Sequence, residues 1–248
     1  MNSEYTTDPR KQCIHNPLWI VLGAGMAFAA WALVALIPSY QRSACIHRIW
    51  KLGGYVQTAS KLPPFEHRFP GVAHGWLGSK VERAVRLVRL AGTEAEDADL
   101  KALCRLSTQR ALDLRDTQVT DTGLRYLQAL RELRVLILTG TSVRDEGVLQ
   151  LGPLKQLEVL CLEETGVTDR AISQLKQLPN LEWLNLSGTA VTDAGLVELA
   201  TCDSLKVLVL EDCATTSSAV ERLRQSSPQL LVFTGNTRRP FLSLLSAY

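Results

Sequence analysis

A short segment of this chain recurs every 24 residues, with no insertion or deletion between its copies. Leu112–Thr117 returns as Leu136–Thr141, Leu160–Thr165 and Leu184–Thr189. A fixed period of this length is typical of an array in which each unit buries its apolar face only against its neighbours. Such arrays display a long surface, so the period favours a binding protein over an enzyme.

Within each repeating unit, apolar residues occupy fixed columns. Two columns alternate as L-x-L, which places both leucines on one side of a short strand. Two further columns lie three residues apart, which is the spacing of one helical face. Each unit is therefore predicted to contain a strand, a turn and a short helix. The strand columns run through Leu112, Leu136, Leu160, Leu184 and Leu208 and through Leu114, Leu138, Leu162, Leu186 and Leu210, and the helix columns include Leu124, Val148, Ile172, Leu196 and Val220.

Hydroxyl and carboxyl residues recur where the predicted strands end and the helices begin. Thr117 and its equivalents in later units follow the strand, where a hydroxyl can satisfy backbone groups of the bend. A Thr-Asp pair such as Thr168-Asp169 precedes the helix, where both residue types are favoured as N-caps. The recurring aspartate is therefore assigned to helix capping and not to catalysis.

The pattern L-x-x-L-x-L-x-x-T-x-V-T-D-x-G-L-x-x-L, which extends over residues 84–226, resembles a leucine-rich repeat. The match is to the short 24-residue form abundant in predicted proteins of planctomycete bacteria, and Leu181–Leu196 fits it closely. The resemblance implies an α/β solenoid with parallel strands on the concave face and short helices on the convex face. It implies no reaction. The last strand, around Leu230 to Phe233, is predicted to be offset by one residue from the repeat.

A long apolar run precedes the repeats. Leu18–Ile37 is an apolar run of 20 residues, and no charged residue occurs from Asn16 through Gln41. A helix rises about 1.5 Å per residue, so this run matches the ~30 Å hydrocarbon thickness of a bilayer. The run exceeds the about 7–15 residues of a secretory signal core, and Pro38–Arg42 is a poor cleavage site. We therefore expect an uncleaved transmembrane helix and a single-pass membrane protein.

The side of the membrane that carries the repeats is not assigned, because two basic residues precede the span closely and three follow it. Small residues recur within the span at Gly23, Gly25, Ala27 and Ala29. Small residues let two transmembrane helices approach closely, so a homodimer remains an alternative to a monomer.

The sequence divides into five segments. They are an N-terminal tail (1–17), the transmembrane helix (18–37), a juxtamembrane helix with the N-terminal cap of the solenoid (38–85), the leucine-rich repeats (86–235) and a C-terminal tail (236–248). Within the cap, residues 41–52 are predicted to be helical, with Gly53-Gly54 as the stop. Tyr55–Thr58 is predicted to form a strand.

No residue set in the sequence supports catalysis, a cofactor or a metal. Glu66, His67 and His74 lie close together, but their spacing matches no ligand motif. The six cysteines lack paired spacing and are interpreted as small buried residues, with a disulfide between Cys202 and Cys213 left open. Residues 86–226 carry sixteen Lys/Arg and twenty-one Asp/Glu, and this net charge of −5 argues against nucleic-acid binding.

The strand residues beside the core leucines are predicted to point out of the concave face, because side chains alternate along a strand. They would form an exposed apolar strip, bordered by charge, with Trp183 near its centre. Such a strip is typical of a protein-binding site. The alternative is that neighbouring side chains, the C-terminal tail or self-association cover some of these residues. The predicted partner-binding residues are Asp113, Arg115, Val135, Ile137, Val159, Glu163, Trp183, Asn185, Val209 and Glu211.

The sequence therefore predicts a membrane-anchored interaction module that binds a protein partner of unknown identity through the concave face of the solenoid. The alternative is a structural envelope scaffold whose solenoids associate with one another. Under either hypothesis the chain contacts the lipid bilayer through residues 18–37 and needs no cofactor.

Overall fold

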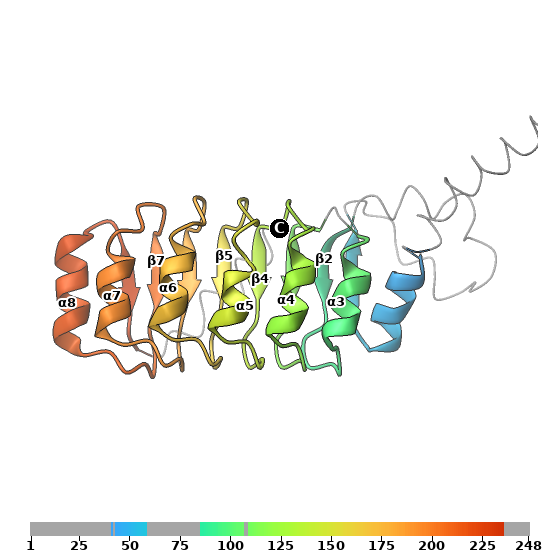
Figure 1. The fold of residues 1–248 in the computed structure, drawn as a ribbon, viewed down its shortest axis with the longest axis horizontal. Helices are drawn as coiled ribbons and strands as arrows, with labels where there is room; N and C mark the ends of the chain where they lie inside the picture. The colour runs from blue at the N-terminus through green and yellow to red at the C-terminus, as the bar shows by residue number, and fades with distance from the viewer. Residues whose placement is uncertain (1–40, 42, 59–84, 107–108, 236–248) are drawn as a thin grey trace, which may run out of the picture. The chain divides into compact units, whose positions relative to one another are not determined.

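The computed structural model describes residues 41, 43–58, 85–106 and 109–235. Short strands and short helices alternate along most of this range (Figure 1). Each 24-residue unit therefore contains the predicted strand, turn and helix. The strands are β1 (Tyr55–Thr58), β2 (Val85–Arg89), β3 (Ala111–Asp113), β4 (Val135–Ile137), β5 (Val159–Cys161), β6 (Trp183–Asn185), β7 (Val207–Val209) and β8 (Leu231–Phe233). The helices are α3 (Asp97–Leu103), α4 (Asp121–Leu127), α5 (Asp145–Leu149), α6 (Asp169–Leu175), α7 (Asp193–Leu199) and α8 (Ser217–Ser226).

The strands form one eight-stranded sheet whose order follows the chain from β1 to β8. β1 is antiparallel to β2, and every later pair is parallel. The predicted one-residue offset of the last strand is wrong. Val232 pairs with Leu208, so β8 keeps the 24-residue register of the other strands. The reason is that Val232 takes the core position that leucine holds in the other units.

The helices α3 to α8 lie side by side along one face of the sheet (Figure 1). The leucines of the strand columns and the apolar residues of the helix columns pack between the sheet and the helices as one continuous core. Leu112, Leu136, Leu160 and Leu184 are fully buried in it. Burying one such side chain contributes about 1.5–3 kcal/mol. The period-two and period-three columns predicted from the sequence are therefore confirmed.

Threonine hydroxyls close the turns that follow the strands, as predicted. Thr117 Oγ1 donates to the carbonyl oxygen of Leu114 at 2.7 Å. The same bond recurs at Thr93, Thr141, Thr165 and Thr189. The carbonyls of Leu90, Leu138 and Leu186 also accept the backbone N–H of the same threonine, so the hydroxyl adds a second hydrogen bond to the turn.

At the helix starts, threonine and aspartate have different roles. Thr168 is the N-cap of α6, and its hydroxyl accepts a hydrogen bond from the backbone N–H of Arg170 at 3.3 Å. The aspartate in the first turn of each of these helices instead bonds to the next unit, also where the residue before it is not threonine, as at Asp145 and Asp97. Asp145 accepts hydrogen bonds from the backbone N–H and the hydroxyl of Thr168. Equivalent bonds join Asp97 to Thr120, Asp169 to Thr192 and Asp193 to Thr216.

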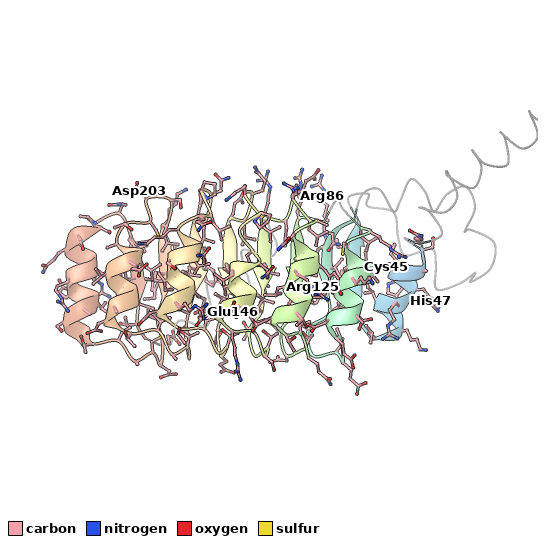
Figure 2. The ribbon with its side chains drawn as sticks, viewed as in Figure 1. Cys45, His47, Arg86, Arg125, Glu146 and Asp203 are labelled. Carbon is pink, nitrogen blue, oxygen red and sulfur yellow. The ribbon has the colours of Figure 1, made fainter. Side chains whose placement is uncertain are left out.

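A helix over residues 43–51 covers one end of the core. Cys45 and Ile49 are buried in the core, whereas His47 lies on the exposed side of this helix (Figure 2). Gly53 follows it with a positive φ of 84°, and its N–H donates to the Trp50 carbonyl at 2.9 Å. The predicted helix stop and the strand β1 are thus both present.

The predicted transmembrane helix, Leu18–Ile37, lies outside the described residues, as do the two predicted tails. In the ranges that the structure does describe, no helix is both long and apolar enough to cross a bilayer.

Candidate interaction surface

The face of the sheet opposite the helices, here named the outer sheet face, carries two rows of side chains. One row holds Leu87, Ala111, Val135, Val159, Trp183, Val207 and Leu231, and the other holds Arg89, Asp113, Ile137, Cys161, Asn185, Val209 and Phe233. Most of the apolar members form a cluster separate from the main core. The strand residues predicted to point away from the helices therefore do so.

The prediction that this face is exposed is wrong for most of its apolar side chains. The exposed fraction is 4% at Leu87 on β2, 0% at Ile137 on β4 and 6% at Trp183 on β6, and it rises to 58% only at Leu231 on β8. Sequence alternation reports the direction of a side chain and not what covers it.

The predicted partner-binding residues therefore differ in exposure from the prediction. Asp113, Val135, Ile137, Val159, Trp183, Asn185 and Val209 are buried, and Arg115, Glu163 and Glu211 are half-buried. All ten lie on the strands β3 to β7 or within two residues of their carboxyl ends. The structure thus brings the predicted set together along one face, but in a covered state.

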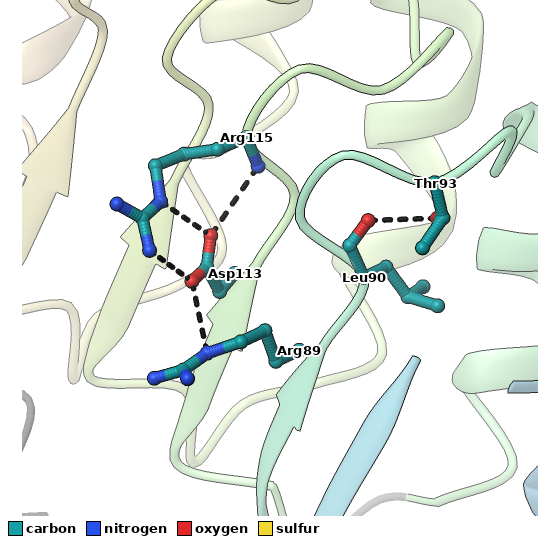
Figure 3. A network of polar contacts seen from close by, with 5 residues as sticks. All are labelled: Arg89, Leu90, Thr93, Asp113 and Arg115. Atoms are coloured by element: carbon teal, nitrogen blue, oxygen red, sulfur yellow. Dashed lines mark hydrogen bonds and ion pairs between the residues drawn. The ribbon is translucent and has the colours of Figure 1, made fainter. Parts of the chain in front are cut away.

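Asp113 is a fully buried carboxylate at the end of β3. Arg115 donates to its two oxygens from Nε at 3.0 Å and from Nη2 at 2.8 Å, and the Nε of Arg89 lies 3.3 Å away (Figure 3). The hydrogen bonds from Arg115 to Asp113 raise the pKa of the Arg115 guanidinium above its ordinary value. A buried carboxylate is costly unless it is paired. Asp113 is fully paired, so it positions the two arginines on the face.

A second polar network lies at the carboxyl end of β6. Asn185 Oδ1 accepts from the backbone N–H of Ser187 at 2.9 Å and from its hydroxyl at 2.7 Å. Asn185 Nδ2 donates to Glu163 Oε2 at 3.3 Å, and the N–H of Glu211 donates to Ser187 Oγ at 3.1 Å. The network places two acidic residues beside the apolar cluster. The border of the face is consequently acidic from β5 to β7.

Cys161 is the nucleophilic side chain within the apolar cluster. Burial raises the pKa of its thiol above the ordinary value, although the Thr139 hydroxyl at 3.1 Å acts in the opposite direction. A buried thiol with a raised pKa stays protonated and reacts poorly. This cysteine therefore contributes packing to the face.

The other candidate chemistry of the sequence receives no support. Cys202 and Cys213 are both free, so the disulfide left open between them is not formed. Across residues 41, 43–58, 85–106 and 109–235, no group of three or more His, Cys, Asp or Glu side chains could hold a metal ion. Glu66, His67 and His74 lie outside these ranges.

Comparisons with known proteins agree with the repeat architecture. Residues 110–127 and 177–200 match the family model described as leucine rich repeat. The chain has no match among curated proteins. The repeat period, the unit structure and this match of two segments all agree with leucine-rich repeats. The described part of the chain is an α/β solenoid with parallel strands and short helices.

Two solved structures are similar to this chain. Internalin C2 of Listeria monocytogenes is 22% identical, with 66% of this chain and 79% of that chain covered, at a TM-score of 0.47. The internalin inlF of the same organism is 18% identical, with 71% of this chain and 59% of that chain covered, also at a TM-score of 0.47.

Proposed function

We propose that this chain is an interaction module whose outer sheet face, the predicted concave face, binds a protein partner. Leucine-rich repeat domains are typically protein-interaction modules. The observation that carries the proposal is the continuous apolar cluster on the side of the sheet opposite the helices, with Trp183 among its members. Interface cores are apolar and enriched in aromatic residues, and their rims are polar. The proposal is one of binding, and no reaction is assigned.

The apolar cluster indicates the chemistry of the partner. Asp113 is paired with Arg89 and Arg115, and Glu163 accepts a hydrogen bond from Asn185. The partner is therefore a segment that presents apolar side chains to the face.

We also propose that Leu18–Ile37 anchors the module in a membrane, on the strength of its length and apolar composition. Fractionation of cells that express the full chain tests the anchor. The protein should stay in the membrane pellet after an alkaline carbonate wash. Recovery of the unprocessed chain in the soluble fraction would contradict the anchor without touching the proposed binding face.

Site-specific photo-cross-linking tests the binding face. A benzophenone amino acid at Glu163 reports on the border of the face, and the same group at Val197, which is 68% exposed on α7, is the matched control. The proposal expects a cross-linked protein partner from position 163 and none from position 197. Equal cross-linking from both positions would contradict it. Cross-links mainly to a second copy of the chain would instead favour the self-associating scaffold.

A further inference from the structure

One column of the repeat follows the edge of the sheet at which the parallel strands begin, here named the amino-end edge. The backbone N–H of each later member donates to the carbonyl oxygen of the member before it, at 2.8 or 2.9 Å. Consecutive members are therefore neighbours, one strand step of about 4.8 Å apart. The members of this column are Arg86, Arg110, Arg134, Glu158, Glu182 and Lys206.

Neighbouring side chains of this column form ion pairs where their charges differ. Arg134 Nη1 lies 2.6 Å from Glu158 Oε1, and the lysine and glutamate at the end of the column are 2.5 Å apart. Arg86 and Arg110 are also neighbours, but they carry the same charge, and neither forms an ion pair with a carboxylate of the described residues. Like charges opposite each other on adjacent strands are destabilising. The column therefore has an uncompensated positive stretch on β2 and before β3.

The loops that lead into the strands add to this positive stretch. The loops before β3 and β4, residues 104–110 and 128–134, carry four arginines and one glutamate. With Arg86 this part of the edge has five arginines against one glutamate, a net charge of +4. The three equivalent loops that follow each carry one basic and one acidic residue, for example Asp203 in the last of them. Arg86 and Asp203 mark the charged and the balanced part of the edge in Figure 2.

The positive stretch adjoins the outer sheet face, because Arg86 directly precedes Leu87 and Arg110 directly precedes Ala111 of that face. Guanidinium groups bind carboxylates through two parallel N–H donors. Arg86 and Arg134 are two strand steps, or about 10 Å, apart, and an extended protein segment presents two side chains on one side over that distance. A protein segment also offers apolar contact to the adjoining face, which a lipid headgroup does not. The net charge of −5 over residues 86–226 disfavours a nucleic acid.

We propose that five arginines of the amino-end edge form a binding site for carboxylate side chains and that its ligand is an acidic stretch of a protein. The site consists of Arg86, Arg105, Arg110, Arg131 and Arg134. One further step rests on the proposed function, namely that this acidic stretch belongs to the partner bound at the outer sheet face. The partner then presents apolar side chains to the face and acidic side chains to the amino-end edge.

Binding of a fluorescein-labelled decaglutamate peptide to the full chain, held in micelles of a zwitterionic detergent, tests the site. Arg110→Glu reverses the charge within the column, and Arg222→Glu makes the same change on the exposed side of α8, away from the edge. Anisotropy titrations should give about tenfold weaker binding or more for Arg110→Glu and a change of less than about twofold for Arg222→Glu. Binding to the natural chain should weaken as the salt concentration rises, because salt screens surface charges.

Two further measurements keep the test decisive. Arg110 is half-buried, so Arg131→Glu, at an exposed position, provides a second variant, and its binding should be weaker by about threefold or more. Circular dichroism shows that each variant is folded. Unlabelled decaglutamate should displace the probe at a lower concentration than a ten-nucleotide oligothymidylate or phosphatidylserine mixed into the micelles. Equal binding by the natural chain and both edge variants, or stronger displacement by either phosphate ligand, would overturn the proposal.

Failure of this site and failure of the proposed function remain distinguishable. If Arg110→Glu loses decaglutamate but position 163 cross-links no partner, the carboxylate site stands and the partner function fails. If position 163 captures a partner while decaglutamate binds the natural chain and Arg110→Glu equally, the site fails and the function stands.

Discussion

The carboxylate of Asp145 accepts two hydrogen bonds from Thr168, one from its backbone N–H at 2.8 Å and one from its hydroxyl at 2.7 Å. The two residues start consecutive helices, α5 and α6. The bond therefore ties the convex side of one repeat to the next. It explains why threonine and aspartate recur together: the threonine caps its own helix, and the aspartate holds the N-cap of the following unit.

Removal of this link should destabilise the solenoid. Asp145→Ala leaves the N–H of Thr168 without its acceptor, and we expect a loss of about 1–3 kcal/mol in the free energy of unfolding. Urea unfolding of the full chain in micelles, followed by circular dichroism, measures the loss. Glu146→Ala is the matched control, since this neighbour pairs with Arg170 at the exposed surface. The control should change stability by less than about 1 kcal/mol, and equal losses would contradict the role of Asp145.

The same links predict a loss of stability in acid. Burial raises the pKa of Asp97, but hydrogen bonds from Thr120, Thr122 and Gly123 outweigh it and hold the pKa below the ordinary value. Hydrogen bonds from Thr216 lower the pKa of Asp193 in the same way. Their unfolded pKa is about 3.9, so their stabilisation is complete above that pH and is lost as the pH falls through the lower folded values.

Urea unfolding between pH 7 and pH 3 tests this pH dependence. The contribution of the two aspartates should be constant between about pH 7 and pH 5 and should fall below about pH 4. The double variant Asp97→Asn/Asp193→Asn should lose stability less steeply in acid than the natural chain. An unchanged slope would show that these carboxylates do not contribute.

A residue with a positive φ occupies the turn after each strand from β2 to β7. The position has φ of +65° at Gly140 and +64° at Gly188, but the unit between them places Glu164 there at +54°. A side chain with a Cβ pays a steric cost in this region. Glu164→Gly should therefore stabilise the chain by about 0.5–1 kcal/mol, measured as a higher urea midpoint. Glu164→Ala should give no gain, and a gain as large as that of glycine would contradict the steric explanation.

Truncation of a buried side chain on either face of the sheet should lower stability more than truncation of an exposed side chain. Leu160→Ala in the main core and Ile137→Ala on the outer sheet face should each cost about 2–5 kcal/mol, because both side chains are fully buried. Val197→Ala on α7 should change stability by less than about 0.5 kcal/mol. A small effect at Ile137 would show that the outer sheet face is open in solution.

The repeat pattern predicted the solenoid because a 24-residue period specifies local structure. Leu112 and Leu114 predicted the core side of β3, and the pairing of Leu112 with Leu136 follows from their identical place in the unit. The offset predicted for β8 was wrong because Val232, and not a leucine, occupies the core position one period after Leu208.

The site was predicted only in part. The direction of Trp183 and Ile137 follows from alternation, but a periodic pattern carries no information about how far each side chain is buried. The pairing of Asp113 with Arg115 was also missed, although the two charges lie two residues apart on one side of β3, a spacing that points to such a pair. The hydrogen bonds between Asp145 and Thr168 join adjacent units. The sequence predicted only that each aspartate caps the helix of its own unit.

Binding of a protein to the outer sheet face is the central claim, and a charge placed on each side of the solenoid tests it most directly. Val207→Lys lies on this face and Val197→Lys on α7, so both variants make the same change. The affinity for the partner captured at position 163 is measured by titration with each folded variant. The account predicts at least tenfold weaker binding, or about 1.4 kcal/mol, for Val207→Lys and an unchanged affinity for Val197→Lys. Equal affinity in the two variants, or a loss only with Val197→Lys, would contradict it.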